Sequence, residues 1–312
     1  MDYIFITISV FGFALQFVLM QIYEKQIKQN LTTGIFLTII TNIVGAVFFF
    51  AISLFKINVS KNAVFLAVLL AVDMVAYNLL SLRALSLGNL AVYSMFMMLG
   101  GMALPVLYGV LFLKEELSVC KIIGLISLTG FMILQALSAG SKSDEKSQPN
   151  YKSGTVNDRR KKWVYLAYCV AVFIVNGLTG VISKAHQVGQ NAVDEKSFLV
   201  LSCSFTVVLG LIIFVIERLM PRKYESNGEL SAMLKVKPLG ISALLGIVMY
   251  GANYFLLLAA RSVPASAQFP IVSGGVIALS ALASVLIFKD KLSKYEIIAV
   301  IGSFLSTILF AF

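Results

Sequence analysis

The sequence predicts an all-α membrane protein of about ten transmembrane helices, arranged as two inverted five-helix repeats around a central cavity. Three observations predict this fold. The chain is 59% hydrophobic and only 13% charged, whereas soluble domains are about 45–50% apolar and about 25% charged. Apolar runs of membrane-spanning length recur along the whole chain. The two halves also share short matched segments, which is how an internal repeat is recognised.

The apolar runs suit transmembrane helices because about 30 Å of hydrocarbon, at 1.5 Å per residue, requires about 20 apolar residues. The first repeat, 1–139, and the second repeat, 163–312, each contain five runs. The segment 140–162 between them is polar and basic and contains Pro and Gly, so we expect a flexible loop. The runs are 3–23, 33–55, 62–82, 90–113, 119–139, 163–183, 197–217, 239–260, 266–288 and 295–312.

The repeat rests on a corner segment found once in each half. Leu111–Ser118 reads LFLKEELS, and 175 positions later Leu286–Ser293 reads LIFKDKLS. The same offset aligns Asn78 with Asn253 and Gly100 with Gly275, and an offset of 161 aligns QIKQN with QVGQN near the start of each half. Five helices are an odd number, so the second half enters the membrane in the opposite orientation. Inverted repeats typically hold a substrate near the bilayer midplane.

Two five-helix halves, each with an LxxK(E/D)xLS corner before its last helix, resemble the EamA-type members of the drug/metabolite transporter superfamily. The resemblance covers almost the whole chain. It implies a ten-helix basket that carries amino acids, other metabolites or drugs, often outward, with helices 4 and 9 lining the cavity. It also implies cytoplasmic termini.

The basic residues indicate the opposite orientation. Lysine and arginine in short loops mark the cytoplasmic side, and 18 of the 25 lie on the side away from the termini. The count therefore predicts external termini, and the direction of transport stays open. The seven on the side of the termini are Lys56, Lys61, Lys114, Lys121, Lys184, Lys196 and Arg261.

Asp73 is the only acid deep within a span. A charged carboxylate at the bilayer centre costs about 2.5 kcal/mol or more, so such a group faces a cavity or is protonated. We therefore consider Asp73 a candidate proton-coupling group; the alternative is a neutral acid hydrogen-bonded to another helix. Candidate substrate-binding residues are the polar, aromatic and methionine side chains of other spans, with packing or interhelical hydrogen bonding as the alternative: Gln16, Tyr77, Asn78, Tyr93, Met97, Asn176, Asn253, Tyr254, Gln268 and Ser273.

Three further features concern residues near helix ends, a proline within a span, and helix faces made of small residues. Lys184 and His186 fall where the 163–183 run ends, so we expect them to snorkel to the interface and to have no catalytic role. Pro270 within the 266–288 run permits local unwinding beside a cavity. Small residues on 119–139 and 295–312 favour close packing, within the protomer or in a homodimer.

The composition also limits the class of function. The net charge of +10 is spread in short clusters between apolar runs, which favours lipid contact over nucleic-acid binding. Isolated cysteines and one histidine predict no metal site or cofactor, and the chain has no GxxxxGK[ST] for ATP. The sequence thus favours a secondary transporter of small molecules in the plasma membrane. The alternatives are a membrane-embedded enzyme acting on lipid or isoprenoid substrates, which lacks evident catalytic groups, and a receptor or scaffold.

Overall fold

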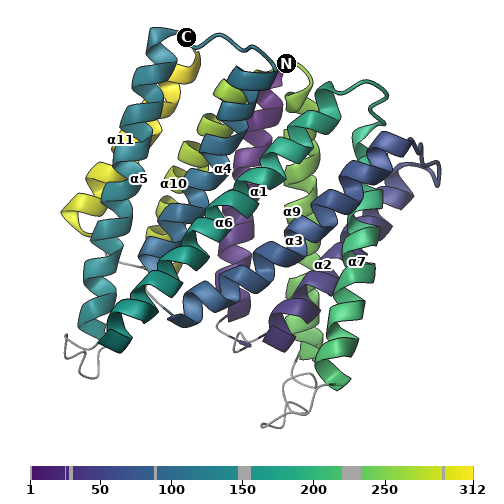
Figure 1. Cartoon of the computed structure of the whole chain (residues 1–312), viewed down its shortest axis with the longest axis horizontal. Helices are drawn as coiled ribbons and strands as arrows, with labels where there is room; N and C mark the ends of the chain where they lie inside the picture. The colour runs from purple at the N-terminus through teal and green to yellow at the C-terminus, as the bar shows by residue number, and fades with distance from the viewer. Residues whose placement is uncertain are drawn as a thin grey trace. The chain divides into compact units, whose positions relative to one another are not determined.

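The computed structural model describes residues 2–24, 26–27, 31–87, 90–146, 156–219, 233–289 and 292–311. Within these ranges the chain is helical and contains no strand (Figure 1). The helices are α1 (Asp2–Glu24), α2 (Leu31–Ile52), α3 (Lys61–Leu87), α4 (Leu90–Phe112), α5 (Val119–Lys146), α6 (Val156–Val188), α7 (Glu195–Leu219), α9 (Val236–Ala260), α10 (Ala265–Phe288), α11 (Lys294–Ile308) and the 3₁₀-helix η1 (Leu309–Ala311).

Each predicted apolar run corresponds to one of these α-helices. In the described part of the chain, 7 helices are long and apolar enough to cross a membrane, and α4 and α5 contribute the shorter apolar stretches Phe96–Phe112 and Val119–Leu134. The predicted loop 140–162 is partly wrong, because α5 continues to Lys146 and α6 begins at Val156. A helix that its apolar part has already nucleated can continue into polar residues, because each added residue gains one hydrogen bond without a new nucleation cost.

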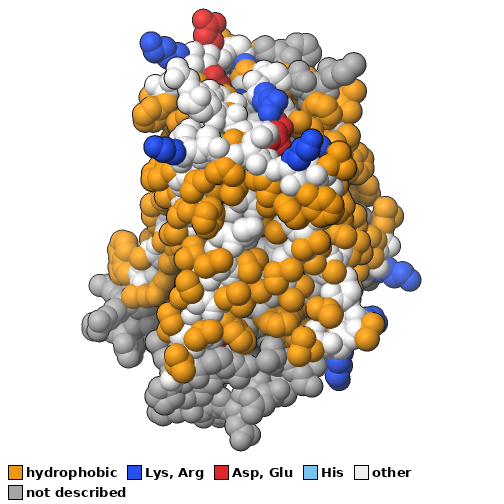
Figure 2. Space-filling model, turned by 90° about the vertical axis from the view of Figure 1, so that its right-hand side faces the viewer, with side chains coloured by type: hydrophobic (Ala, Val, Ile, Leu, Met, Phe, Trp, Pro, Cys, Tyr) orange, Lys and Arg blue, Asp and Glu red, His pale blue; other side chains and the backbone are white. Residues whose placement is uncertain are grey.

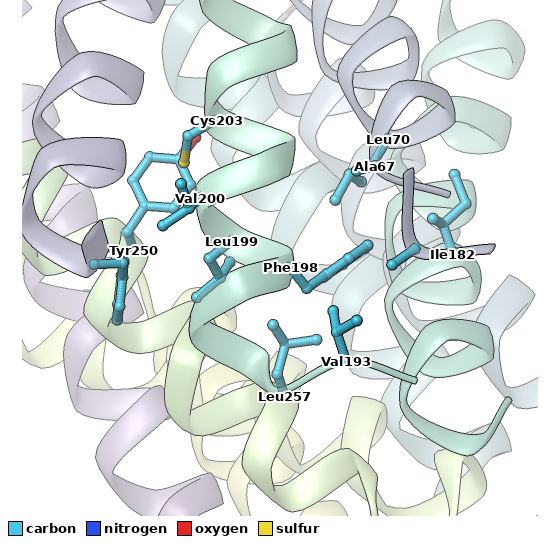
Figure 3. Close-up of a cluster of buried hydrophobic side chains, with 12 residues drawn as sticks. Ala67, Leu70, Ile182, Val193, Phe198, Leu199, Val200, Cys203, Tyr250 and Leu257 are labelled. Atoms are coloured by element: carbon cyan, nitrogen blue, oxygen red, sulfur yellow. The ribbon is translucent and has the colours of Figure 1, made fainter. Parts of the chain in front are cut away.

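The chain folds into two compact units, and each unit takes helices from both predicted repeats. Unit 1 comprises Met1–Asn78 and Ile182–Ser262, so it contains α1, α2, α7, α9 and parts of α3 and α6. Its main apolar cluster is built around Phe49, Phe198 and Tyr250, with Ala67 and Leu70 of α3 and Leu257 of α9 among its members (Figure 3). Within unit 1, α2 packs on α7 and α1 packs on α9.

Unit 2 comprises Leu79–Val181 and Val263–Phe312. Here α4 packs on α10, and α5 packs on α11. The small face of α11 is buried, with Ala299 and Ser303 fully enclosed. A Cβ on Gly302 would overlap the ring of Phe131 on α5. The small face predicted on 295–312 is therefore used for close packing inside the protomer.

Apolar side chains also cover outward-facing parts of unit 1. Val47 on α2 and Val208 and Val215 on α7 are 63%, 53% and 52% exposed. On the face shown in Figure 2, hydrophobic side chains cover the middle, Asp and Glu lie at the upper end together with Lys and Arg, and further Lys and Arg lie along the lower right edge. Hydrocarbon is the solvent that such an apolar band suits, since charged residues of membrane proteins gather outside the hydrocarbon layer.

The two LxxK(E/D)xLS corners have matching local geometry. Lys114 and Lys289 both adopt the left-handed conformation, with φ of 55° and 56°. Non-glycine residues rarely adopt this conformation, and it is common at helix C-termini. Four residues after each lysine, Ser118 Oγ accepts a hydrogen bond from Lys121 N and Ser293 Oγ accepts one from Glu296 N, both at 3.2 Å. Each corner therefore ends one helix and caps the next in the same way.

Candidate functional site

A chain of hydrogen bonds crosses the interior of unit 1 and joins four helices. The Tyr250 hydroxyl of α9 bonds the Cys203 thiol of α7 and donates to Asn42 Oδ1 of α2 at 2.5 Å. Asn42 Nδ2 donates to the Thr38 carbonyl at 2.8 Å. Asn78 Nδ2 of α3 donates to Thr38 Oγ1 at 3.0 Å. Figure 3 shows the thiol of Cys203 directed toward the Tyr250 ring.

This hydrogen-bond chain bears on the expected role of the two asparagines. The Asn78 amide bonds α2, and Asn253 Nδ2 donates to the Met249 carbonyl of its own helix at 2.8 Å. Buried amides in an apolar helix require such partners. For Asn78 Nδ2 and Asn253 Nδ2 the structure thus supplies protein acceptors. Both residues remain half-buried, which leaves part of each side chain accessible.

Four other candidates lie in unit 1. Asp73 on α3 is buried, with 6% of its surface exposed, and Tyr77 one turn later is half-buried. The Tyr254 ring packs on the cluster around Phe49, 5.4 Å between centroids. Gln16 Oε1 on α1 is buried and forms no hydrogen bond with any residue that the structure describes. An amide oxygen in that position is a ready acceptor for a ligand donor.

The remaining candidates lie in unit 2. Asn176 Nδ2 of α6 donates to the Met97 carbonyl of α4 at 2.7 Å. Tyr93 is buried and its backbone bonds the Tyr165 hydroxyl, while Gln268 is fully buried. Ser273 is half-buried. These contacts hold α4 and α6 together.

The local unwinding predicted at Pro270 does not occur. The helix α10 is continuous from Ala265 to Phe288 and passes through Pro270. Pro270 lies in the second turn, where the loss of one N–H removes only one intrahelical hydrogen bond.

The predicted snorkelling of Lys184 and His186 to the interface is wrong. Both side chains are buried, at 3% and 0% exposure. Lys184 Nζ donates to the carbonyl of Ala260, the last residue of α9, at 2.8 Å. A lysine at a helix C-terminus satisfies an unpaired carbonyl and complements the helix dipole. The positive charge therefore serves the end of α9 within unit 1 instead of reaching the membrane surface.

Lys184 and His186 belong to a polar cluster that we call the α6–α7 corner; it comprises Lys184, His186, Gln187, Asp194, Glu195 and Arg261. Arg261 forms an ion pair with Glu195 and donates from Nε to Gln187 Oε1 at 3.3 Å. Gln187 Nε2 lies 2.9 Å from His186 Nδ1. The His186 ring stacks on Phe198, with centroids 3.8 Å apart.

Asp194 caps the N-terminus of α7 within this corner. Its carboxylate accepts hydrogen bonds from Ser197 N at 3.1 Å, from Ser197 Oγ at 2.8 Å and from Asn58 Nδ2 at 2.9 Å. Burial alone would raise the pKa of Asp194, but these hydrogen bonds outweigh it and hold the pKa below its ordinary value of 3.8. The carboxylate is thus kept charged at the positive end of α7.

Sequence reasoning missed this corner as a site, although one signal was present. Residues 183–197, SKAHQVGQNAVDEKS, hold four charged residues and the single histidine of the chain between two apolar runs. The partners Asn58 and Arg261 are remote in sequence, and no local pattern joins them. Among the described residues, no group of three or more His, Cys, Asp or Glu could hold a metal ion.

The first corner segment forms a second long-range cap. The carboxylate of Glu115 accepts hydrogen bonds from Ala265 N at 2.7 Å and from Ser266 N at 2.8 Å. Ala265 is the first residue of α10, and Pro264 before it offers no side-chain cap. The acid of the corner therefore stabilises the start of α10. Its counterpart Asp290 lies outside the described residues.

These features define, over the residues that the structure describes, an all-helical protein in which 7 helices have the length and apolarity of membrane spans. No protein-family model matches the chain, and no curated protein matches it by sequence. Among solved structures, 28 chains resemble it. One of them, described only as a crystal structure of a protein, has a TM-score of 0.67 and 15% sequence identity, over 97% of this chain and 95% of that chain. The likeness shows a shared fold over nearly the full length.

Proposed function

We propose that this chain is a secondary transporter of small organic molecules (amino acids, related metabolites or drugs) that works in the plasma membrane by alternating access, as the EamA-type resemblance implies. The observation that carries the proposal is the duplicated corner. Lys114 and Lys289 share a left-handed backbone, and Ser118 and Ser293 cap the following helices alike. A left-handed residue followed by a side-chain cap also occurs between α2 and α3 (Leu54 and Ser60) and between α6 and α7 (Asn191 and Asp194). The support for an internal duplication therefore comes from this geometry together with the matched sequences LFLKEELS and LIFKDKLS at the two corners.

Helix pairing gives further support. Counting five helices per repeat, α2 corresponds to α7, α4 to α10 and α5 to α11, and each of these pairs is in contact. A two-fold relation between repeats places each helix of such a pair against its own counterpart. Inverted repeats with this relation underlie alternating access in several transporter folds.

Asp73 is the group we propose for proton coupling. Its side chain is buried in unit 1 on a helix rich in apolar residues. A carboxylate there costs at least about 2.5 kcal/mol when charged, so gain and loss of a proton change its energy strongly. Polar groups such as Gln16 and Asn78 in the same unit are the proposed substrate contacts.

The test is transport by purified protein in liposomes. An untargeted comparison of metabolites inside and outside expressing and deletion cells would first provide the substrate. Flux of that substrate is then measured with and without a pH gradient for wild type and Asp73→Asn. We expect the gradient to drive wild-type flux and to have no effect on the variant, because an amide cannot carry the proton.

The matched control is Glu116→Gln, the same chemical change at an exposed acid of the α4–α5 corner. It should retain gradient-driven flux. Flux that is independent of pH in wild type and unchanged in Asp73→Asn would refute coupling through Asp73. Consumption of the metabolite without movement would instead favour the membrane-embedded enzyme.

A further inference from the structure

The α6–α7 corner contains the single histidine of the chain, and its ring has unequal surroundings. His186 is fully buried and stacked on Phe198. Its Nδ1 faces the side-chain amide of Gln187 at 2.9 Å. Its Nε2 is buried and forms no hydrogen bond with any described residue. One ring nitrogen is therefore held by protein, and the other is not.

The orientation of Gln187 follows from Arg261. A guanidinium only donates hydrogen bonds, so the amide atom 3.3 Å from Arg261 Nε must be the oxygen. The amide nitrogen then faces His186. Since that nitrogen also only donates, His186 Nδ1 must be the acceptor. A neutral ring in this arrangement carries its proton on Nε2.

We propose that His186 is a proton-binding site and that its protonation is transmitted through Gln187 to Arg261. A proton taken from water adds to Nδ1, and Nδ1–H then faces the N–H groups of Gln187. Two donors cannot bond, so the amide must rotate by half a turn to present Oε1 to the ring. Rotation turns the amide nitrogen toward Arg261, which also only donates. Protonated His186 and the Gln187–Arg261 hydrogen bond therefore exclude each other.

Two charges of opposite sign act on the His186 ring. Arg261, at the end of α9, repels a proton on the ring, and Asp194, in the segment before α7, attracts one. Glu195 pairs with Arg261, and Lys184 on α6 bonds the end of α9. Protonation leaves the Arg261–Glu195 pair in place and releases Arg261 from α6. The proposal concerns this corner alone and does not depend on the proposed transport function.

The first test is the tautomer of His186. With one histidine in the chain, ¹⁵N-histidine labelling of the full protein in detergent micelles gives a single imidazole to observe. Near neutral pH we expect wild type to show Nε2 protonated and Nδ1 unprotonated. Arg261→Met frees Gln187 to rotate, so the Nδ1–H tautomer should appear.

The control for the tautomer test is Lys294→Met, which removes an exposed positive charge at the start of α11 in unit 2, outside the α6–α7 corner, and should give the wild-type spectrum. A wild-type ring protonated on Nδ1 would overturn the proposal. An Arg261→Met spectrum identical to wild type would overturn it as well.

The second test follows Arg261 during acidification of ¹⁵N-arginine-labelled protein. The Arg261 Nε–H signal, identified by its loss in Arg261→Lys, should shift with the same midpoint as the His186 ring. In Gln187→Glu the carboxylate accepts from both neighbours at once, so the Arg261 signal should not follow the ring. The coupling is refuted if the Arg261 Nε–H signal of wild type stays constant while the His186 ring titrates. It is also refuted if the Arg261 signal of Gln187→Glu follows the ring as in wild type.

Discussion

Removal of the Glu115 carboxylate tests the long-range cap of α10. Its two oxygens accept hydrogen bonds from Ala265 N and Ser266 N, and both of these residues are fully buried. Each buried N–H left without an acceptor costs about 1–3 kcal/mol. Since the charge also interacts with the start of α10, we expect Glu115→Ala to lower the free energy of unfolding by about 2–4 kcal/mol.

Glu115→Gln should lower the free energy of unfolding by less than Glu115→Ala does. The amide retains one acceptor oxygen, but its N–H groups face a backbone donor. We expect a loss of about 1–2 kcal/mol. Glu116→Gln changes an exposed neighbour in the same way and should stay within about 0.5 kcal/mol of wild type.

A change at Gly109 tests the same cap without altering the acid. A Cβ there would lie 2.6 Å from Glu115 Oε2 and 3.1 Å from Ala265 Cβ. Gly→Ala within a helix normally stabilises by about 1 kcal/mol. If the carboxylate is needed where it lies, Gly109→Ala will destabilise the protein despite this propensity gain.

Unfolding of these variants can be followed in mixed micelles through the reactivity of Cys169 and Cys203, which are buried in the folded chain. The exposed Cys120 is replaced by serine in every sample. A Glu115→Ala protein as stable as the Glu116→Gln control would refute the capping argument.

Two further predictions concern unit 1. Tyr250→Phe removes both hydrogen bonds of the hydroxyl, to Asn42 Oδ1 and to the Cys203 thiol. Each bond between membrane helices contributes about 0.6–1.7 kcal/mol, so the free energy of unfolding should fall, measured through Cys169 because Cys203 itself loses a partner; a value equal to that of wild type would contradict the prediction. The folded-state pKa of Asp194 lies below its ordinary value of 3.8. The charged carboxylate therefore stabilises the folded protein above pH 3.8, and this stabilisation is lost as the pH falls through the folded-state pKa. Asp194→Asn, which still caps α7, should flatten this acid-side loss relative to wild type, and equal acid sensitivity of the two proteins would contradict the assignment.

The helices were predictable from the sequence because hydropathy over about 20 residues reports a property of one helix alone. The matched corners were predictable for a related reason, since LFLKEELS and LIFKDKLS specify the same turn chemistry locally. Asp73 lies within the expected helix and is buried. Its proposed function in proton coupling stays a prediction.

Partners remote in sequence were not predictable. Glu115 bonds residues 150 and 151 positions away, and Lys184 bonds a carbonyl 76 positions away. Composition near a helix end suggests snorkelling, and only the tertiary fold shows which other helix end is near. The extension of α5 and α6 into 140–162 was missed for the opposite reason, because polar helical turns carry no hydropathy signal.

The burial of Lys184 also changes the argument on orientation. A lysine bonded to the end of α9 inside unit 1 is not available to headgroups, so the count on the side of the termini falls from seven to six, against 18 on the other. The charge count therefore predicts external termini more strongly than the sequence alone did. Ser262, exposed in the segment between α9 and α10, should then lie outside. In a Cys120→Ser background, Ser262→Cys should react with a membrane-impermeant maleimide on intact cells, and reaction only after permeabilisation would reverse the orientation.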